Sequence, residues 1–237
     1  DNSDRNYKIK KMLFTGIENM TIVTPSKWLF DTVKETYLKD YPINVINNGV
    51  DLNVFKQRKS VFRLQYGLEG KYIILGVASI WNERKGYQYF VDISRKLNAD
   101  ERVVLVGVDE RLISRLPRGI IGILKTNNPL ELAEIYSASD VFINPTLEDN
   151  FPTTNLEALA CGTPVITFNS GGSPECLNEE CGIVVPRGDK NGLVNAIRLI
   201  RKKSKIYYTP KCQKRVVDYY DKDDCFEEYI DLYKKLS

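Results

Sequence analysis

Six short apolar runs, separated by segments with helical spacing, fill residues 71–200. The first run, at 72–78, is apolar at almost every position, which is typical of a strand buried on both faces of a parallel sheet. The other strands are predicted at 102–106, 119–124, 141–144, 165–168 and 182–185. Helices are predicted between them at 84–97, 110–116, 129–138 and 154–161, briefly near Pro174, and at 188–203. This alternation predicts the α/β class, with a doubly wound, Rossmann-like parallel sheet.

The segments outside this alternation divide the chain further. Residues 1–45 are predicted to hold a helix or tail and then one strand and one helix, which look like a step of another sheet. Residues 46–70 are predicted to be a linker, 71–205 the sheet domain, and 206–237 two C-terminal helices. Because a lone strand and helix cannot bury a core, we expect a neighbouring domain that these residues do not supply.

The composition excludes several classes of protein. The 237 residues carry 34 basic and 31 acidic side chains, and the net charge of +3 is too small to predict nucleic-acid binding. The absence of histidine excludes a Ser-His-Asp or Cys-His apparatus within these residues and argues against a zinc site. Five scattered cysteines without a CxxC pair fit a reducing compartment, so we expect a cytoplasmic protein.

Membrane attachment has only a weak signal in the sequence. No apolar run approaches the roughly 18 residues of a membrane span, and no signal peptide opens the sequence. The basic residues at 201–205 are interpreted as a solvated surface. A peripheral contact with the inner face of an anionic membrane is the alternative interpretation.

An acidic loop joins the strand at 141–144 to the next predicted helix, which opens at Thr153 or Thr154. Carboxylates from Glu148 and Asp149 therefore meet free backbone N–H groups and a helix N-terminus at the carboxyl end of a parallel strand, where ligands bind in such sheets. The helix N-terminus suits phosphate, whereas carboxylates repel phosphate and suit neutral hydroxyl groups. The combination predicts a ligand with both groups, a nucleotide sugar.

The same loop has a plainer interpretation. Thr154 and Glu157 match a capping box, in which the glutamate only satisfies backbone N–H groups at the start of the helix. The preceding residues, Asn150, Phe151 and Pro152 after two acids, exceed what capping requires. Phe151 is interpreted as an anchor that folds the loop onto the core.

A second polar loop follows the first strand of the sheet. It begins at Ser79 and carries two cations, Arg84 and Lys85, which are predicted to lie at a helix N-terminus. It is neither a dinucleotide fingerprint nor a P-loop. A phosphate held between the cations would offset their repulsion from the helix dipole; a solvated basic turn is the alternative.

Two further loops follow strands at the same predicted edge. Gly171 and Gly172 permit a positive φ and a close approach of the backbone to a ligand, although a tight turn explains them as well. Lys125 and Thr126 end another strand, where they would flank a base.

These residues together resemble the carboxyl-terminal half of the retaining GT-B glycosyltransferases of family four. Residues 22–28 are similar to the end of that family's amino-terminal domain, and residues 45–51 are similar to its interdomain segment. Residues 140–165 are similar to its donor-site signature, in which two glutamates are spaced E-x7-E. The resemblance covers nearly the whole chain.

The resemblance implies a role for each matching residue. Glu157 would hold the ribose hydroxyls, and Asp149 would contact the donor sugar in place of the family's first glutamate, unless Glu148 does so after a one-residue shift. The backbone N–H groups of residues 150–154 would face the sugar and diphosphate. Lys85 would contact the diphosphate.

One cation of the family is absent from this sequence. The family's arginine falls on Ile80, and we expect Arg84 to substitute for it.

The resemblance implies a hexosyltransferase that moves a sugar, with retention, from a UDP- or GDP-sugar to a polysaccharide or lipid-linked acceptor. It implies no metal and no other cofactor. The acceptor site belongs to the amino-terminal domain in this family, so the chain is expected to bind donor but to be inactive alone. The alternatives are a sugar-nucleotide epimerase or phosphorylase of the same fold, and a non-catalytic α/β binding module.

Overall fold

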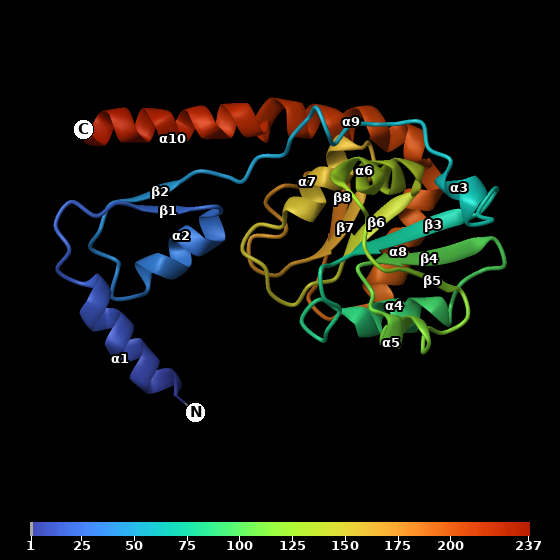
Figure 1. Ribbon diagram of the computed structural model, residues 1–237, viewed down its shortest axis with the longest axis horizontal. Helices are drawn as coiled ribbons and strands as arrows, with labels where there is room; N and C mark the ends of the chain where they lie inside the picture. Colours follow the sequence, from blue (N-terminus) through green and yellow to red (C-terminus); the bar gives the residue numbers. More distant parts are fainter. Residues whose placement is uncertain (1) are drawn as a thin grey trace.

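The computed structural model describes residues 2–237; Asp1, with which the predicted first segment begins, lies outside the described residues. The N-terminal segment contains a protruding helix, two short parallel strands and a second helix (Figure 1). These elements are α1 (Ser3–Phe14), β1 (Ile22–Thr24), α2 (Lys27–Lys34) and β2 (Ile43–Val45). The predicted strand and helix are confirmed, and β2 pairs with β1 rather than with the large sheet.

The main body is a six-stranded sheet in which every neighbouring pair is parallel, with the strand order β5-β4-β3-β6-β7-β8. Every residue of β6 and β7 is buried, and apart from Asn144 and Thr167 these residues are apolar, as in a sheet covered on both faces. The six strands are β3 (Tyr72–Val77), β4 (Glu101–Val106), β5 (Ile120–Ile123), β6 (Val141–Asn144), β7 (Val165–Phe168) and β8 (Gly182–Val185). The predicted fold class is confirmed.

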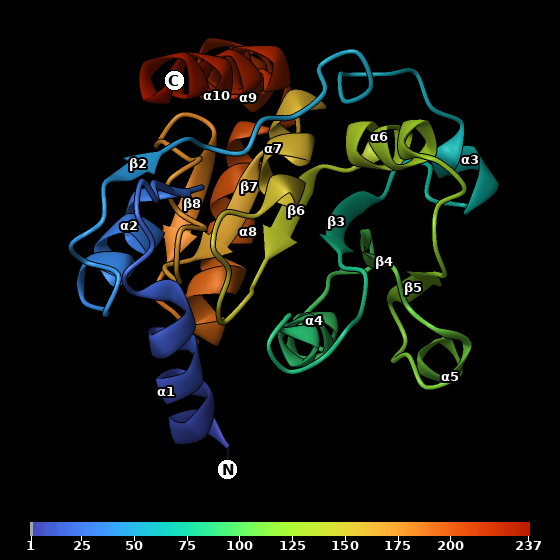
Figure 2. The same cartoon turned by 60° about the vertical axis from the view of Figure 1, so that its left-hand side comes forward.

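Helices cover both faces of this sheet, as Figure 2 shows with α4 and α5 below it and α6 above it. The helix α8 packs against α4, whereas α6 packs against α7 and α7 against α9. The helices after the linker are α3 (Phe62–Gln65), α4 (Tyr87–Ser94), α5 (Glu110–Ile113), α6 (Pro129–Ala138), α7 (Thr153–Ala160), α8 (Lys190–Lys203), α9 (Lys205–Tyr219) and α10 (Lys222–Leu236).

Two predicted helices differ from the structure. The helix predicted from residue 84 begins only at Tyr87, because the carbonyl oxygen of Arg84 accepts the N–H of Leu147 and Gly86 has a φ of +76°. The prediction of a short helix near Pro174 is wrong. Residues 170–177 form successive turns with bonds to the third residue back, such as Glu175 N–H to the carbonyl of Gly172.

The chain passes between the N-terminal segment and the sheet twice, and the two passages touch. The N–H of Val50 donates to the carbonyl of Tyr220, and the N–H of Lys222 donates back to Val50. A Cβ on Gly49 would lie 2.4 Å from Cα of Lys222, so only glycine fits this crossing. From here α10 runs across the molecule towards β2 (Figure 1).

The first and last helices of the chain keep large apolar side chains on the surface. Phe226, Ile230 and Tyr233 of α10 are exposed, whereas the apolar side chains of α2 are half-buried. All five cysteines are buried and free. Within residues 2–237, no helix has the length and apolar character needed to cross a membrane.

Candidate functional site

The strand order reverses its direction between β3 and β6, and in open parallel sheets such a reversal leaves a crevice between the two loops. The chain moves outwards from β3 to β4 and β5, then returns to β6 and moves the opposite way to β7 and β8. Loops leaving β3 and β6 therefore diverge, and ligands bind at such a switch point, outside the carboxyl ends of the strands. These are the loops at 78–86 and 145–152 that the sequence singled out.

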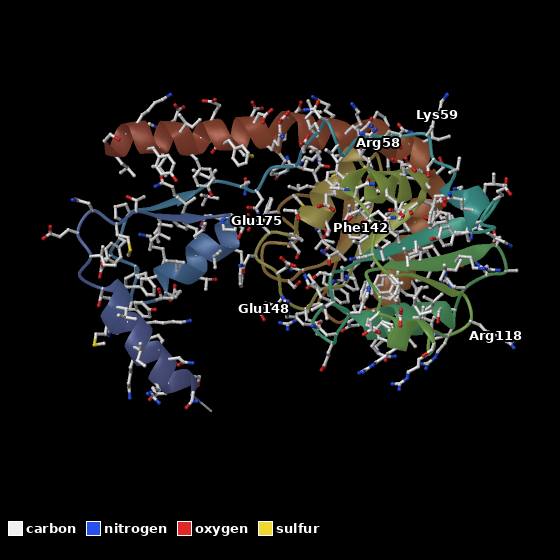
Figure 3. All side chains as sticks on the ribbon, viewed as in Figure 1. Arg58, Lys59, Arg118, Phe142, Glu148 and Glu175 are labelled. Atoms are coloured by element: carbon white, nitrogen blue, oxygen red, sulfur yellow. The ribbon has the colours of Figure 1, made fainter. Side chains whose placement is uncertain are left out.

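An ion pair joins these two loops. Nζ of Lys85 lies 2.8 Å from Oδ2 of Asp149, and both side chains are largely shielded from solvent, with 26% and 18% of their surface exposed. The guanidinium of Arg84 donates to the carbonyl of Glu148 at 3.2 Å. The Glu148 carboxylate points outwards at the rim (Figure 3). Asp149, rather than Glu148, thus presents its carboxylate to the cation.

The acidic loop is fixed by its aromatic residue. Phe151 is only 3% exposed, and its ring centroid lies 5.7 Å from that of Tyr220, which confirms the predicted anchor. Pro152 is buried at the N-cap position of α7. Asn150 is exposed, but its carbonyl oxygen lies against Gly172. The loop is therefore anchored at its end, while the side chains of Glu148 and Asn150 are exposed.

The first turn of α7 keeps free donors. Within residues 2–237, the amide N–H groups of Thr153 and Thr154 have no hydrogen-bond acceptor, and the N-cap residue supplies no side-chain cap. The capping-box interpretation is wrong, because Glu157 does not reach back to the helix start. Its Oε2 instead accepts a hydrogen bond from the hydroxyl of Tyr136 at 3.0 Å.

Burial changes the chemistry of Glu157. Removal from solvent raises the pKa of Glu157 to about 7, and the bond from Tyr136 opposes part of this rise. Tyr136 is completely buried, and its ring packs edge-on against Phe142 with centroids 5.4 Å apart. Tyr136 gave no functional signal in the sequence, because its position on the apolar face of a helix marked it only as core.

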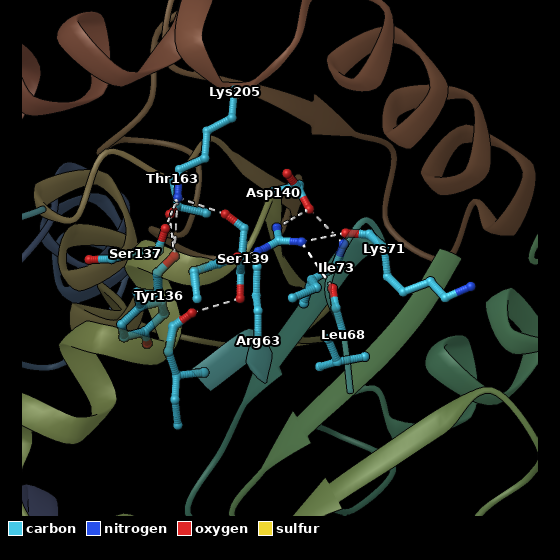
Figure 4. Close-up of polar contacts among 12 residues, drawn as sticks. Arg63, Leu68, Lys71, Ile73, Tyr136, Ser137, Ser139, Asp140, Thr163 and Lys205 are labelled. Carbon is cyan, nitrogen blue, oxygen red and sulfur yellow. Dashed lines mark hydrogen bonds and ion pairs between the residues drawn. The ribbon is translucent and has the colours of Figure 1, made fainter. Parts of the chain in front are cut away.

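The end of α6, which positions Tyr136, is tied down by a buried lysine (Figure 4). Nζ of Lys205 donates to the carbonyls of Ser137 at 2.6 Å, Ser139 at 2.7 Å and Tyr136 at 3.3 Å. The hydroxyl of Thr163 donates to the same Tyr136 carbonyl at 2.6 Å. Burial lowers the pKa of Lys205 to about 8. The hydroxyl that holds Glu157 is thus set on a fixed helix end.

An open pocket of about 790 Å³ lies at the carboxyl ends of β3, β4 and β5. Ser79 and Lys125 line it, as does Leu132 of α6, one turn before Tyr136. Its volume is within the range of small-molecule sites. Lys85 and Asp149 do not line this pocket, so the predicted residues form two groups: Ser79 and Lys125 at the pocket, and the ion pair beside α7. Helix α6 connects them, because Leu132 lines the pocket and Tyr136 binds Glu157 of α7.

The comparison with known families agrees with this architecture. A family model described as glycosyl transferases group 1 matches residues 71–202. The chain belongs to this family.

Two curated members of the group show how much of a relative this chain represents. It is 28% identical over 220 residues to the Escherichia coli UDP-Gal:alpha-D-GlcNAc-diphosphoundecaprenol alpha-1,3-galactosyltransferase, covering 85% of this chain and 56% of that protein. It is 26% identical over 207 residues to the N-acetyl-alpha-D-glucosaminyl L-malate synthase of Bacillus anthracis, covering 81% and 54%. The chain spans about half the length of the curated relatives it matches.

Solved structures share the fold. The sucrose-phosphate synthase of Thermosynechococcus elongatus superposes with a TM-score of 0.86 at 22% identity, covering 99% of this chain and 62% of that one. HepE of Anabaena, solved in complex with UDP, gives 0.83 at 18% identity, covering 98% and 68%. A C-terminal domain of a group 1 glycosyl transferase from Francisella tularensis gives 0.61 at 21% identity, covering 73% and 99%. The sheet thus has the fold of a GT-B carboxyl-terminal domain.

A metal centre has no support in the described residues. Among residues 2–237, no group of three or more histidine, cysteine, aspartate or glutamate side chains is arranged to hold an ion. The cations available at the crevice are Arg84 and Lys85.

Proposed function

We propose that this chain is the donor-binding half of a retaining glycosyltransferase and binds a nucleotide-diphosphate sugar in the crevice between β3 and β6. The observation that carries the proposal is the half-buried ion pair between Lys85 and Asp149, beside the free N–H groups that open α7. A cation, free amides and a carboxylate within one crevice match a diphosphate next to sugar hydroxyls.

The nucleoside would occupy the open pocket and its inner margin. Ser79 and Lys125 would flank the base, and Glu157 would accept hydrogen bonds from the ribose hydroxyls. The buried Tyr136 hydroxyl occupies one side of the Glu157 carboxylate, which leaves the remaining lone pairs for a ligand. A carboxylate that is costly to bury gains most from a partner that donates two hydroxyl groups.

Donor binding would separate Lys85 from Asp149 and give each side chain a new partner. A diphosphate attracts Lys85 more strongly than one carboxylate does, because it carries more charge and more acceptor oxygens. Asp149 is then released to accept hydroxyls of the donor sugar. The N–H groups of Thr153 and Thr154 and the guanidinium of Arg84 would complete the phosphate contacts.

The chemical role of these groups is to stabilise the leaving diphosphate. When the bond between the anomeric carbon and the phosphate oxygen breaks, negative charge grows on the diphosphate. Once the donor has drawn Lys85 from Asp149, Lys85, Arg84 and the positive end of α7 would face that charge, and preorganised stabilisation of this kind is a large term in enzyme catalysis. The acceptor hydroxyl, which forms the new bond with retention, would be supplied outside this half.

The donor and acceptor classes have support from the relatives. The galactosyltransferase of Escherichia coli is named for a UDP-sugar and a diphosphoundecaprenol acceptor, and HepE was solved with UDP. We therefore infer a UDP-sugar as the first donor to test and a polysaccharide or lipid-linked acceptor. Free, buried cysteines support a reducing location, such as the cytoplasm, where an acceptor of the second kind would bring the protein to the inner membrane face.

Thermal unfolding of the chain with UDP, GDP, ADP, dTDP and CMP tests the proposal. A nucleotide at about a hundred times its Kd adds roughly 2.7 kcal/mol. For a chain of this size, the expected rise in Tm is roughly 5–10 °C. The rise is expected to disappear in Lys85→Ala and to persist in Lys59→Ala, which removes an exposed lysine away from the crevice (Figure 3). No rise with any nucleotide would favour a non-catalytic module and refute donor binding by this half.

A further inference from the structure

Glu175 joins the glycine-rich loop after β7 to the start of α2, which is nearly 150 residues earlier in the chain (Figure 3). Its Oε2 accepts the N–H of Lys27 and its Oε1 accepts the N–H of Trp28, both at 2.8 Å. The next N–H, of Leu29, is taken by the hydroxyl of Ser26 at 3.1 Å. The carboxylate thus supplies most of the cap of α2, and its charge is favourable at the positive end of that helix.

The main chain of Glu175 is held from the opposite side. Its carbonyl oxygen accepts a hydrogen bond from the guanidinium of Arg215 at 3.2 Å and from the hydroxyl of Tyr220 at 3.1 Å. Arg215 lies in α9 and Tyr220 directly follows that helix, so both donors come from the C-terminal helices. The residue that caps α2 is therefore also hydrogen-bonded through its main chain.

The same loop touches the proposed donor site. The N–H of Gly172 donates to the carbonyl of Asp149 at 3.0 Å. A Cβ on Gly172 would lie 1.9 Å from the carbonyl oxygen of Asn150 and 2.7 Å from Cβ of Ser26. Only glycine allows the acidic loop, the glycine-rich loop and the start of α2 to meet so closely. The acidic loop is thus connected to the start of α2 through Gly172.

We propose that Glu175 is a latch that fixes α2 and the β1–β2 pair against the sheet domain and couples their placement to occupancy of the donor site. The coupling rests on the proposed function, because it needs a diphosphate to draw Lys85 away from Asp149. Rearrangement of Asp149 then reaches Gly172 and, three residues later, the Glu175 carboxylate. Glu175 is a positioning residue, since it touches backbone N–H groups and not the ligand.

Hydrogen exchange of the intact chain, read by mass spectrometry, tests the latch without any ligand. Glu175→Gln keeps the size of the side chain but removes its charge and one of the two acceptors. Exchange in peptides covering residues 22–45 is expected to rise roughly tenfold or more, since hydrogen bonds to charged groups are among the stronger ones. Peptides from β3 to β8 are expected to be unchanged. The control is Glu179→Gln, the same change at an exposed carboxylate of the same loop. Equal exchange in residues 22–45 of both variants and the parent would overturn the latch.

The coupling is tested by adding the nucleotide that raises the Tm of the parent chain. Exchange in residues 22–45 is expected to slow in the parent and in Glu179→Gln, and to stay fast in Glu175→Gln. A raised Tm without any slowing in the parent overturns the coupling but not donor binding. If no nucleotide raises the Tm, the proposed function and the coupling both fail, and the ligand-free comparison still decides whether Glu175 is a latch.

Discussion

The sheet domain and the N-terminal segment are stabilised in opposite ways. Strands β6 and β7 are buried at every position, and large side chains such as Phe142 are completely enclosed. In residues 2–45, by contrast, the buried side chains are Thr24 and Ser26, both polar. The sheet is held by apolar packing, which tolerates no gaps, whereas the segment depends on a few directed hydrogen bonds to the sheet domain. Loss of one contact should therefore have local consequences in the segment and global ones in the sheet.

The largest expected effect contrasts one phenylalanine from each region. Phe142→Ala removes a fully buried ring and leaves a cavity, so it is expected to lower the free energy of unfolding by about 3–5 kcal/mol. Phe14→Ala on α1, where the side chain is 46% exposed, is expected to cost less than about 1 kcal/mol. Urea unfolding of the two variants measures both values. Similar losses would show that the N-terminal segment has a core of its own.

The second expected effect is on binding rather than on stability. Glu157→Gln replaces the buried carboxylate without changing its size, and it is expected to weaken nucleotide-diphosphate binding roughly 10- to 100-fold. Stability at pH 8 is expected to hold or rise, because a carboxylate buried at a cost is gone. Glu69→Gln makes the same change at an exposed position and should leave affinity unaltered. Isothermal titration of each variant gives the Kd; unaltered affinity in Glu157→Gln removes this residue from the ribose site.

The sheet could be predicted from the sequence, because apolar runs that alternate with segments of helical spacing reflect strands buried on two faces. The sequence also located the acidic loop and the cations, since the carboxyl ends of parallel strands share one edge. The sequence could not distinguish the role of Glu148 from that of Asp149, because both residues are acidic and adjacent. Only the fold of the loop decides which carboxylate faces Lys85.

Contacts between segments that are distant in the chain could also not be predicted from the sequence. The capping-box interpretation of Glu157 failed because a local pattern competed with a partner, Tyr136, from another helix. No local pattern connected Glu175 with its partners on α2, which lie nearly 150 residues away. The helix predicted near Pro174 failed for a related reason, since turns bound to the acidic loop replaced the helical bonds.

The third expected effect is a pH dependence that separates affinity from stability. Burial raises the pKa of Glu157 to about 7 from its ordinary 4.5, and ribose recognition needs the ionised form. Between pH 6 and 8 the ionised fraction increases roughly tenfold, so nucleotide affinity is expected to rise by about that factor. The contribution of Glu157 to the free energy of unfolding changes with pH in the opposite direction to the affinity. Between about pH 4.5 and 7 the folded chain keeps a proton that the unfolded chain has lost, so the contribution of Glu157 to stability falls as pH rises.

The variant Tyr136→Phe sharpens this pH prediction. It removes the hydrogen bond that favours the ionised form of Glu157, so the pKa of Glu157 should rise further and the binding profile should move to higher pH. The ring packing against Phe142 is kept. Fluorescence or calorimetric titrations with nucleotide from pH 5.5 to 8.5 record the profile. An identical profile for the parent and the variant contradicts the assignment of Tyr136 as the partner that sets the charge of Glu157.

The smallest expected effect compares two ion pairs of equal length. Asp4 and Lys8 of α1 lie 2.8 Å apart, as do Lys85 and Asp149, but the α1 side chains are 77% and 74% exposed. Water and salt screen the exposed pair, so its coupling energy in a double-mutant cycle is expected to be no more than about 0.5 kcal/mol and to vanish in high salt. The shielded pair is expected to exceed about 1 kcal/mol and to resist salt. Its coupling should then disappear when saturating nucleotide is present, because the diphosphate takes Lys85 away from Asp149. A coupling that survives saturation would mean that the two side chains stay together in the complex, and that Asp149 does not pass to the donor sugar.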